Sequence, residues 1–421
     1  MSAALDAIAF RFRALKHRDF RLFWNGQLVS LVGTWMQSVA QLWLMHRLTG
    51  SAFMLGLVTF LQFLPVLAFS LWAGVIADRT DKRRFLLVTQ IAAMVQAVVL
   101  AALTSLGLIQ ASSLLALALV FGVINAFDLP ARQAFVFELV GKEDLPNAIA
   151  LNSAAFNTAR VFGPAVAGVI VGLGDEAWCF WINAVTFTAV IWSLQQMHAT
   201  PFVKPAGEGS VLARMREGLA YIRGVPSIRN LLVLLGIAGG LGFQYLVLLP
   251  VYAKDILRAG PEAYGLLVTS FGLGSLVAAG WMTRRMDRWG LRRNLLIGLS
   301  SAALGLCVFA WSRALPLSLA MGFVSGFGLI LYVASTNTLL QLTTEDGFRA
   351  RVMSFYTLML VGTAPLGAIV SGSIAQWLGA PAATTLSAIV LAGSATWVFF
   401  RLRALAAREA AQPTEPVWNE R

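Results

Sequence analysis

The stretch Gly74-Val-Ile-Ala-Asp78-Arg79-Thr-Asp81-Lys82-Arg83-Arg84 concentrates charge between two long runs of sequence that contain none. Leu48–Ala77 runs into its first residues, and Phe85–Phe127 follows it. A helix that crosses a bilayer needs about 20 apolar residues, so each run is long enough to span a membrane. A weaker copy, Asp287-Arg288-Trp289-Gly290-Leu291-Arg292-Arg293, occurs later in the chain. Both stretches are therefore predicted to be polar turns between membrane-spanning helices.

The composition of the whole chain indicates that its main solvent is lipid. Apolar residues make up 58% of the 421 residues, before glycine is counted, and charged residues only 12%. Soluble proteins have about 45–50% apolar residues with glycine included and about 25% charged residues. These values exclude a disordered chain, a collagen and an ordinary cytosolic enzyme. Cys179 and Cys307 lie far apart in apolar surroundings, so no disulfide framework is expected.

The remaining uncharged runs predict the other membrane-spanning helices. Phe85–Phe127 and Val352–Phe400 each accommodate two helices, with turns near Thr104–Ser113 and Gly379–Pro381. One further helix, about Asn152–Leu173, is interrupted by Arg160. The single spans lie at residues 22–46, 48–77, 177–203, 231–253, 263–283, 294–312 and 314–344. The sequence therefore predicts an all-α polytopic membrane protein with twelve transmembrane helices.

The longest polar connection divides the predicted helices into two sets of six. It covers 197–229 and contains a segment with apolar residues at helical spacing, which we expect to lie as an amphipathic helix on the inner leaflet. The predicted units are an N-terminal tail, a first bundle, this linker, a second bundle and a C-terminal tail. Their bounds are 1–20, 21–196, 197–229, 230–400 and 401–421.

The two halves have the pattern of a repeat. Gly163-Pro164 is matched by Ala364-Pro365 after 201 residues, and Glu143-Asp144 by Glu345-Asp346 after 202 residues. Similar offsets with the same topology predict two pseudo-symmetric six-helix bundles related by an axis along the membrane normal. Secondary transporters are built this way, with their substrate path between the bundles.

The distribution of basic residues predicts the orientation in the membrane. The predicted tails and the even-numbered loops hold 28 of the 32 Lys and Arg residues when Arg132 and Arg160, which lie near the same face, are counted with them. Basic residues are enriched in cytoplasmic loops, so both termini are expected to be cytoplasmic and the protein to lie in the bacterial inner membrane. The net charge of +12 then faces anionic lipid, and no nucleic-acid partner is expected. We also expect no cleaved signal peptide, because the first apolar segment is a full span with a basic flank.

The charged turn resembles the loop 2–3 signature of the major facilitator superfamily, G-x-x-x-D-R-x-G-R-R. Lys82 and Arg83 fill the two basic positions, whereas Asp81 replaces the glycine. Other segments are similar to the branch of enterobactin exporters and macrolide-efflux proteins. They are Trp35-Met36-Gln37-Ser38-Val39-Ala40-Gln41, Phe127-Asp128-Leu129-Pro130-Ala131-Arg132-Gln133, Asn157-Thr158-Ala159-Arg160-Val161-Phe162-Gly163-Pro164 and Arg351-Val352-Met353-Ser354. Gly163, Pro164 and Gly168 match part of the helix 5 signature of antiporters, and the first glycines of that signature are absent.

The resemblance implies that the charged turn gates the transport cycle. The gating residues would be Gly74, Asp78, Arg79, Lys82 and Arg83, with Asp287, Arg288 and Arg292 in the second copy. The family pattern implies a relay from Asp78 to Lys82 and on to an acid on helix 4, here Asp128. The alternative is that the basic residues of this turn only set the topology.

Three ionisable residues fall inside predicted spans, where charge is costly and often functional: Asp128, Arg132 and Arg160. Asp128 could pair with Arg132, four residues along the same helix face, or with Arg160 on the next helix. The pair could be a static link between helices or a proton-linked switch. Proton coupling could also run through a boundary acid such as Asp255.

Uncharged polar residues inside spans are candidates for the substrate cavity, although each could equally form a helix–helix hydrogen bond. Gln37 and Gln41 share one face of the first helix. The family resemblance implies that Asn125, Gln244, Tyr245 and Asn337 lie on cavity-lining helices. Tyr332 could line an adaptable apolar pocket.

The repeat and the charge pattern predict a secondary transporter, and the family resemblance implies that it exports small amphipathic compounds, drug-like or siderophore-like, by proton antiport. We expect a monomer in the lipid bilayer, with no cofactor beyond the proton gradient and no metal site. No enzyme motif is found, so enzymatic chemistry is not expected. The alternatives are a lysophospholipid or lipid flippase on the same fold and a non-transporting membrane sensor.

Cysteine labelling tests the predicted topology. In a Cys179→Ala/Cys307→Ala background, a cysteine at Ser112 should react with a membrane-impermeant thiol reagent added to the periplasmic side. A cysteine at Ser210 should react only in inside-out vesicles, because the basic linker is expected in the cytosol. The reverse pattern would contradict the orientation derived from the basic residues.

Overall fold

The computed structural model describes residues 12–197, 211–282 and 288–411, and every regular element among them is a helix. Most of the two predicted tails, Ser210 and Asp287 lie outside these described ranges. The first half contains a short 3₁₀ turn and five helices: η1 (Arg13–Lys16), α2 (Arg18–Thr49), α3 (Ala52–Arg79), α4 (Lys82–Ser105), α5 (Ala111–Gly172) and α6 (Ala177–Gln196).

The second half is more broken than the first, because π-helical turns interrupt two of its crossings. Its elements are α7 (Val211–Gly224), α8 (Pro226–Ile237), η2 (Ala238–Gly242), α9 (Tyr245–Val251), η3 (Tyr252–Ile256), α10 (Pro261–Met282), α11 (Arg288–Trp311), α12 (Leu315–Thr343), α13 (Asp346–Thr357), η4 (Leu358–Gly362), α14 (Ala364–Leu378) and α15 (Ala380–Ala411). The π-helical turns η2 and η3 belong to the seventh crossing and η4 to the eleventh. Such turns are frequent at functional sites.

The helices account for twelve crossings of a membrane. Eleven helical stretches among the described residues are long and apolar enough to span a bilayer. One of them, α5, has 62 residues, which at 1.5 Å per residue is about 90 Å and far longer than a bilayer is thick. Gly141 breaks α5 with a φ of 69° and a ψ of −179°, a conformation open to glycine but not to residues with a side chain. The helix is therefore two crossings joined at Gly141.

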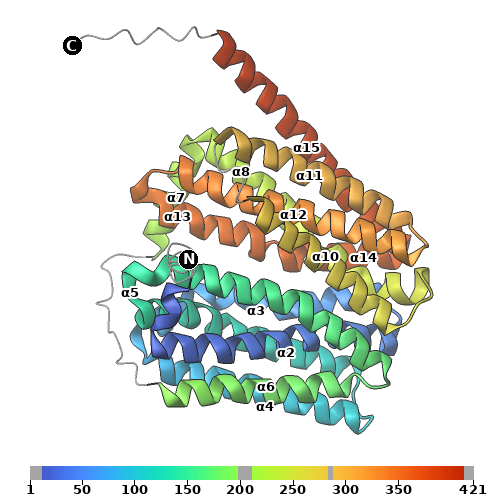
Figure 1. The fold of residues 1–421 in the computed structure, drawn as a ribbon. Coiled ribbons are helices and arrows are strands. Elements are labelled where there is room, and N and C mark those ends of the chain that lie inside the picture. The colour runs from blue at the N-terminus through green and yellow to red at the C-terminus, as the bar shows by residue number, and fades with distance from the viewer. Residues whose placement is uncertain (1–11, 198–210, 283–287, 412–421) are drawn as a thin grey trace, which may run out of the picture.

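The crossings form two bundles that lie one above the other in Figure 1, with α2–α6 in the lower bundle and α8–α15 in the upper one. In the first bundle α2 packs against α5 and α6, and α4 packs against the same two helices. In the second bundle α11 packs between α12 and α15, and α10 packs against α12. The predicted architecture of two six-helix bundles is confirmed.

The two bundles meet along two lines of small residues, α3 against α14 and α5 against α10. A Cβ on Gly168 would lie 2.8 Å from the Cα of Gly265, and a Cβ on Gly56 would lie 2.4 Å from the carbonyl oxygen of Ala368. At these points the backbones of the two bundles touch directly. Small residues allow this close approach, which stabilises helix pairs in membranes through van der Waals contact and not through the hydrophobic effect.

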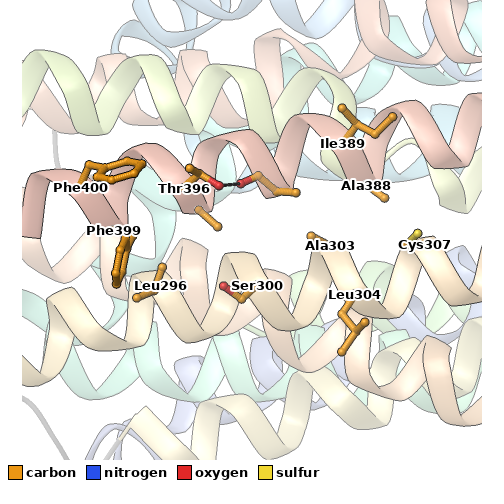
Figure 2. Close-up of a pocket in the computed structure, with 12 residues that line it drawn as sticks. Leu296, Ser300, Ala303, Leu304, Cys307, Ala388, Ile389, Thr396, Phe399 and Phe400 are labelled. Carbon is orange, nitrogen blue, oxygen red and sulfur yellow. Dashed lines mark hydrogen bonds between the residues drawn. The ribbon is translucent and has the colours of Figure 1, made fainter.

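The outer face of the bundles is apolar, as expected for contact with lipid. Trp72, Leu173 and Trp377 are 66%, 84% and 86% exposed, which would be unfavourable in water. Figure 2 shows a groove of about 750 Å³ on this face, lined by side chains of α11 and α15 such as Leu296 and Phe400. Both helices belong to the second bundle, so this groove is separate from the interface between the bundles.

The linker helix α7 packs against the second bundle. The ring of Tyr221 stacks on Phe348 with centroids 4.2 Å apart, and Glu217 lies 3.0 Å from Arg351. A Cβ on Gly218 would approach the side chain of Arg351 at 3.1 Å. Aromatic and ionic contacts therefore attach one side of α7 to α13, and the position of α7 at the inner leaflet stays a prediction.

The glycine contact between α5 and α10 predicts a large effect of a single side chain. Gly265→Val should lower the unfolding temperature, because the new Cβ would lie 2.6 Å from the Cα of Gly168 and overpacking costs about 1–3 kcal/mol. Gly393→Val is the control, since a Cβ there meets nothing within 4 Å. Thermal unfolding in detergent, followed by tryptophan fluorescence, measures both. Equal unfolding temperatures would contradict a tight contact at this point.

Candidate functional site

The charged turn between α3 and α4 binds helices of the first bundle to one another. The side chain of Asp81 accepts a hydrogen bond from the backbone N–H of Arg84 at 3.2 Å, so this acid caps the start of α4. The guanidinium of Arg83 donates to the carbonyl oxygens of Leu194 and Gln195, at 2.5 and 2.8 Å, at the end of α6. These carbonyls have no partner within their own helix, and a cation near a helix C-terminus is favourable.

Lys82 pairs with Glu138 and not with Asp128. The Nζ of Lys82 lies 2.7 Å from the Oε1 of Glu138, and the two side chains are only 7% and 6% exposed. Asp128 lies ten residues earlier on the same helix, a separation of about 15 Å along its axis. The relay implied by the family resemblance therefore has the wrong acid on helix 4. Sequence reasoning missed Glu138 because this acid lies beyond the end of the uncharged run Phe85–Phe127. Glu138 is on the helical turn of α5 that faces the start of α4.

The other predicted gating residues are only partly described. Arg79 is exposed, Arg292 is partly buried, and a Cβ on Gly74 would meet nothing within 4 Å. The side chains of Asp78 and Arg288 are outside the described part of the structure, as is Asp287. The first step of the relay, from Asp78 to Lys82, stays a prediction.

Asp128 lies inside the first bundle, 1% exposed, and is held by three donors. The hydroxyl of Thr89 donates at 2.7 Å and the amide of Gln90 at 2.8 Å, both from α4. The guanidinium of Arg132 donates to the other carboxylate oxygen from one turn further along α5. Of the two partners considered from the sequence, Arg132 is the one the structure has.

Arg160 faces the second bundle. Its guanidinium donates a hydrogen bond to the hydroxyl of Ser275 on α10, across the bundle interface. The alternative in which Arg160 pairs with Asp128 is wrong, because Asp128 is held by Arg132 inside the first bundle. Sequence reasoning found Arg160 from its position inside a span but could not identify the helix that it contacts.

Most of the predicted cavity residues are enclosed by the surrounding helices in this conformation. The amide of Gln37 donates to Gln96 at 3.1 Å and accepts from Asn183 at 2.7 Å, so it ties α2 to α4 and α6. Gln244, Tyr245 and Tyr332 are at most 3% exposed. Of the two roles considered for Gln37, the structure has the helix–helix hydrogen bond. The other three side chains are enclosed in this conformation, and their role in a cavity stays a prediction.

Four predicted cavity residues keep unused or accessible polar groups, and one of them is Tyr332, whose buried hydroxyl has no hydrogen-bond partner among the described residues. Asn125 and Asn337 are partly exposed. Gln41 is 1% exposed, and its Nε2 has no hydrogen-bond partner among the described residues. These side chains remain candidates for substrate contact.

The helix 5 motif performs two packing tasks. A Cβ on Gly163 would lie 2.6 Å from the Cβ of Trp35, so this glycine brings α5 against α2 within the first bundle. Gly168, one and a half turns further on, forms the contact with Gly265 of the second bundle. Pro164 between them is fully enclosed.

A second polar contact links the bundles at the end opposite the charged turn. The Nε2 of His46 on α2 lies 2.9 Å from the Oδ2 of Asp255 on η3, with the histidine 2% exposed. Nearby, the rings of Trp43 and Tyr264 stack with centroids 5.8 Å apart. Asp255 was expected as a boundary acid, and its histidine partner was missed because the two are 209 residues apart.

At the same end as the charged turn, Asp144 fastens the start of the chain to the first bundle. Its carboxylate, at the turn between the two crossings of α5, contacts His17, Arg13 and Lys16. Hydrogen bonds from His17 and then from Arg13 and Lys16 hold the pKa of Asp144 well below its usual range.

Two six-helix bundles that touch through glycines, with buried ion pairs inside one bundle and few polar ties between them, define a membrane transporter of the major facilitator fold. The sequence profile of the transmembrane secretion effector family matches residues 9–421. The chain belongs to this family of the major facilitator superfamily.

Relatives in this family are named as exporters and efflux pumps. The chain is 24% identical to the staphyloferrin A transporter of Staphylococcus aureus (strain NCTC 8325 / PS 47), covering 85% of this chain and 90% of the relative. It is 28% identical to the multidrug efflux pump Tap of Mycolicibacterium fortuitum, covering 84% and 88%. It is 23% identical to the enterobactin exporter EntS of Escherichia coli O1:K1 / APEC, covering 88% of each.

Solved structures share the fold at low sequence identity. A bacterial homologue of the human lysosomal transporter Spinster, in an inward-facing and occupied conformation, matches with a TM-score of 0.72 at 13% identity, covering 92% of this chain and 97% of that one. The nucleoside transporter NupG matches with a TM-score of 0.68 at 13% identity, covering 90% and 98%. The family makes the protein a transmembrane secretion transporter, and the solved structures show that it shares their fold.

The buried pair of Lys82 and Glu138 predicts a strong dependence of stability on both partners. Glu138→Gln should destabilise the protein by about 3–5 kcal/mol, because it leaves the Lys82 ammonium buried without a counter-charge. The double variant Lys82→Met/Glu138→Leu should recover much of that loss. Arg84→Gln, at an exposed position of the same turn, is the control for removing charge alone. If the separate effects of Lys82→Met and Glu138→Leu on thermal unfolding add up to the effect of the double variant, the pair is not coupled.

Proposed function

We propose that the protein exports small amphipathic compounds from the bacterial cytoplasm by proton antiport with alternating access. The names of its relatives support the substrate class, since they include siderophore transporters and a multidrug efflux pump. The charge distribution supports an inner-membrane location with the charged turn on the cytoplasmic side. The working unit is a monomer, because each chain contains both bundles, and the energy source is the proton gradient.

Alternating access is supported by the contrast between ties within a bundle and ties between bundles. Within the first bundle, buried ion pairs and hydrogen bonds such as Lys82–Glu138 and Gln37–Asn183 make a rigid unit. Between the bundles, the backbones touch through glycines such as Gly168 and Gly265, which slide or separate without breaking an ion pair. Two rigid bodies with such an interface can rock around a central site.

The protein's outer end is closed by contacts between the bundles. His46 contacts Asp255, Trp43 stacks on Tyr264, and the hydroxyl of Ser51 donates to Gln376 at 2.8 Å. With the charged turn on the cytoplasmic side, all three contacts lie at the periplasmic end. In the proposed cycle these contacts form in the inward-facing state and break when the site opens to the periplasm.

The single observation that carries proton coupling is the environment of Asp128. This carboxylate is buried in the first bundle and accepts hydrogen bonds from a hydroxyl, an amide and a guanidinium. A proton bound to the carboxylate would compete with these donors. Protonation of Asp128 would release Arg132 and change how α4 and α5 pack. Such a local change of charge is the kind of event that shifts a two-state equilibrium of bundles.

Asp128→Asn tests this coupling in proteoliposomes. The amide mimics the protonated acid, so the variant should bind and exchange substrate but fail to concentrate it when a pH gradient is imposed. The expected loss of uphill transport is tenfold or more, which corresponds to about 1.4 kcal/mol of conformational bias. Glu143→Gln, an exposed acid at the turn of the same helix, should keep uphill transport.

Two other results would count against Asp128 as the coupling group. Full pH-driven transport by Asp128→Asn would leave the residue a structural role only. Joint loss of folding and binding would assign it to a static ion pair with Arg132. 1-Pyrenebutyrate is a suitable transport probe, because its fluorescence can be followed and it is a small amphipathic compound.

A further inference from the structure

Arg160 is a cation at the junction of the two bundles, and within the described ranges it has no acid beside it. It lies near the middle of the second crossing of α5 and is partly buried at the interface between the bundles. Its hydrogen-bond partner is the hydroxyl of Ser275 on α10. One N–H of the five in a guanidinium is thereby satisfied, and the positive charge is not.

The acids inside the first bundle are already committed to other cations. Asp128 is paired with Arg132, and Glu138 is paired with Lys82. Among the described residues of the membrane-spanning segments, no carboxylate pairs with Arg160 within 4 Å. The described part of the interface between the bundles therefore carries an uncompensated positive charge.

An uncompensated charge inside a membrane protein is unstable without a counter-charge. Removing a guanidinium from water costs several kcal/mol, and a single hydroxyl does not offset that cost. An anion would offset it, and the planar guanidinium is well suited to bind two oxygen atoms of a carboxylate or a similar group at once.

The surroundings of Arg160 are apolar and aromatic. Tyr245 lies near enough to interact electrostatically with the guanidinium, and its ring stacks on Phe271 with centroids 4.1 Å apart. Gly272 faces Val161, where a Cβ would approach the valine side chain at 2.9 Å. Tyr245, Phe271 and Val161 are at most 5% exposed. This apolar surface therefore becomes available to the body of an amphipathic ion when the bundles separate, while Arg160 pairs with the charge of the ion.

We propose that Arg160 binds the anionic group of the transported compound, so that the preferred substrates are amphipathic anions that carry a carboxylate or a comparable oxyanion. This rests on the proposed export function. Because Arg160 belongs to one bundle and Ser275 to the other, an anion that engages the guanidinium competes with the hydrogen bond across the interface. Substrate binding would thereby loosen one of the contacts that hold the bundles together in the present conformation.

Binding of two matched probes tests the proposal. The probes are 1-pyrenebutyrate and its methyl ester, which share an apolar body and differ in the negative charge. Affinity is measured for the full-length protein in lipid nanodiscs by quenching of tryptophan fluorescence, with protein-free nanodiscs subtracted. The wild-type protein should bind the acid at least tenfold more tightly than the ester.

Three variants separate charge from packing. Arg160→Gln should abolish the preference for the acid, and Arg160→Lys should retain part of it, because the charge stays and the two-oxygen geometry is lost. Ser275→Ala removes the hydrogen bond and keeps the cation, so it should retain the full preference. The unfolding temperature of each variant without a probe shows whether it is folded, and Arg160→Lys keeps the test valid if Arg160→Gln does not fold.

The outcomes are decisive in either direction. Wild-type protein that binds neither probe, or both equally, overturns the proposal, as does a preference that survives in Arg160→Gln. Loss of the preference in Ser275→Ala as well would make Arg160 a tether between bundles and not an anion site. The binding measurement uses no pH gradient, so a failure of proton-driven export with the preference intact would overturn the proposed function alone.

Discussion

The cost of placing charge in a bilayer is the constraint on which the rest of this structure depends. A charged side chain inside the membrane must find a counter-charge or several hydrogen-bond donors. The buried acids Glu138 and Asp128 therefore have specific partners. Glu138 pairs with Lys82, and Asp128 contacts Arg132, Thr89 and Gln90. These partners join α4 to α5, which makes the first bundle a rigid body.

The two bundles contact each other mainly through uncharged groups. It is made by backbone against backbone at Gly168 and Gly265, and by Gly56 against the carbonyl of Ala368. Such contacts gain van der Waals energy over a short range and contain no charge that must be unpaired when they separate. Strong ties inside a bundle and uncharged contacts between bundles are the mechanical conditions for one bundle to move against the other.

Polar links across the described interface are few, and they lie where a transport cycle needs them. His46 with Asp255 closes the end opposite the charged turn, and Arg160 with Ser275 lies near the middle of the crossing. The first is an ionisable pair that a change in solution conditions can reach, since Asp255 is 49% exposed. The second is a cation whose described partner is a hydroxyl, so it is sensitive to the charge of whatever enters the interface.

The sequence by itself determined the number of crossings, their approximate ends and the positions of the charged turn, Asp128 and Arg160. Span length and charge are properties of the chain read one residue at a time, and the bilayer imposes them directly. Only the tertiary structure decided the partners: Glu138 for Lys82, Ser275 for Arg160, and Asn183 for Gln37. A partner depends on how each helix is rotated and which helix lies beside it, and twelve apolar helices with similar faces do not reveal that rotation in their sequence.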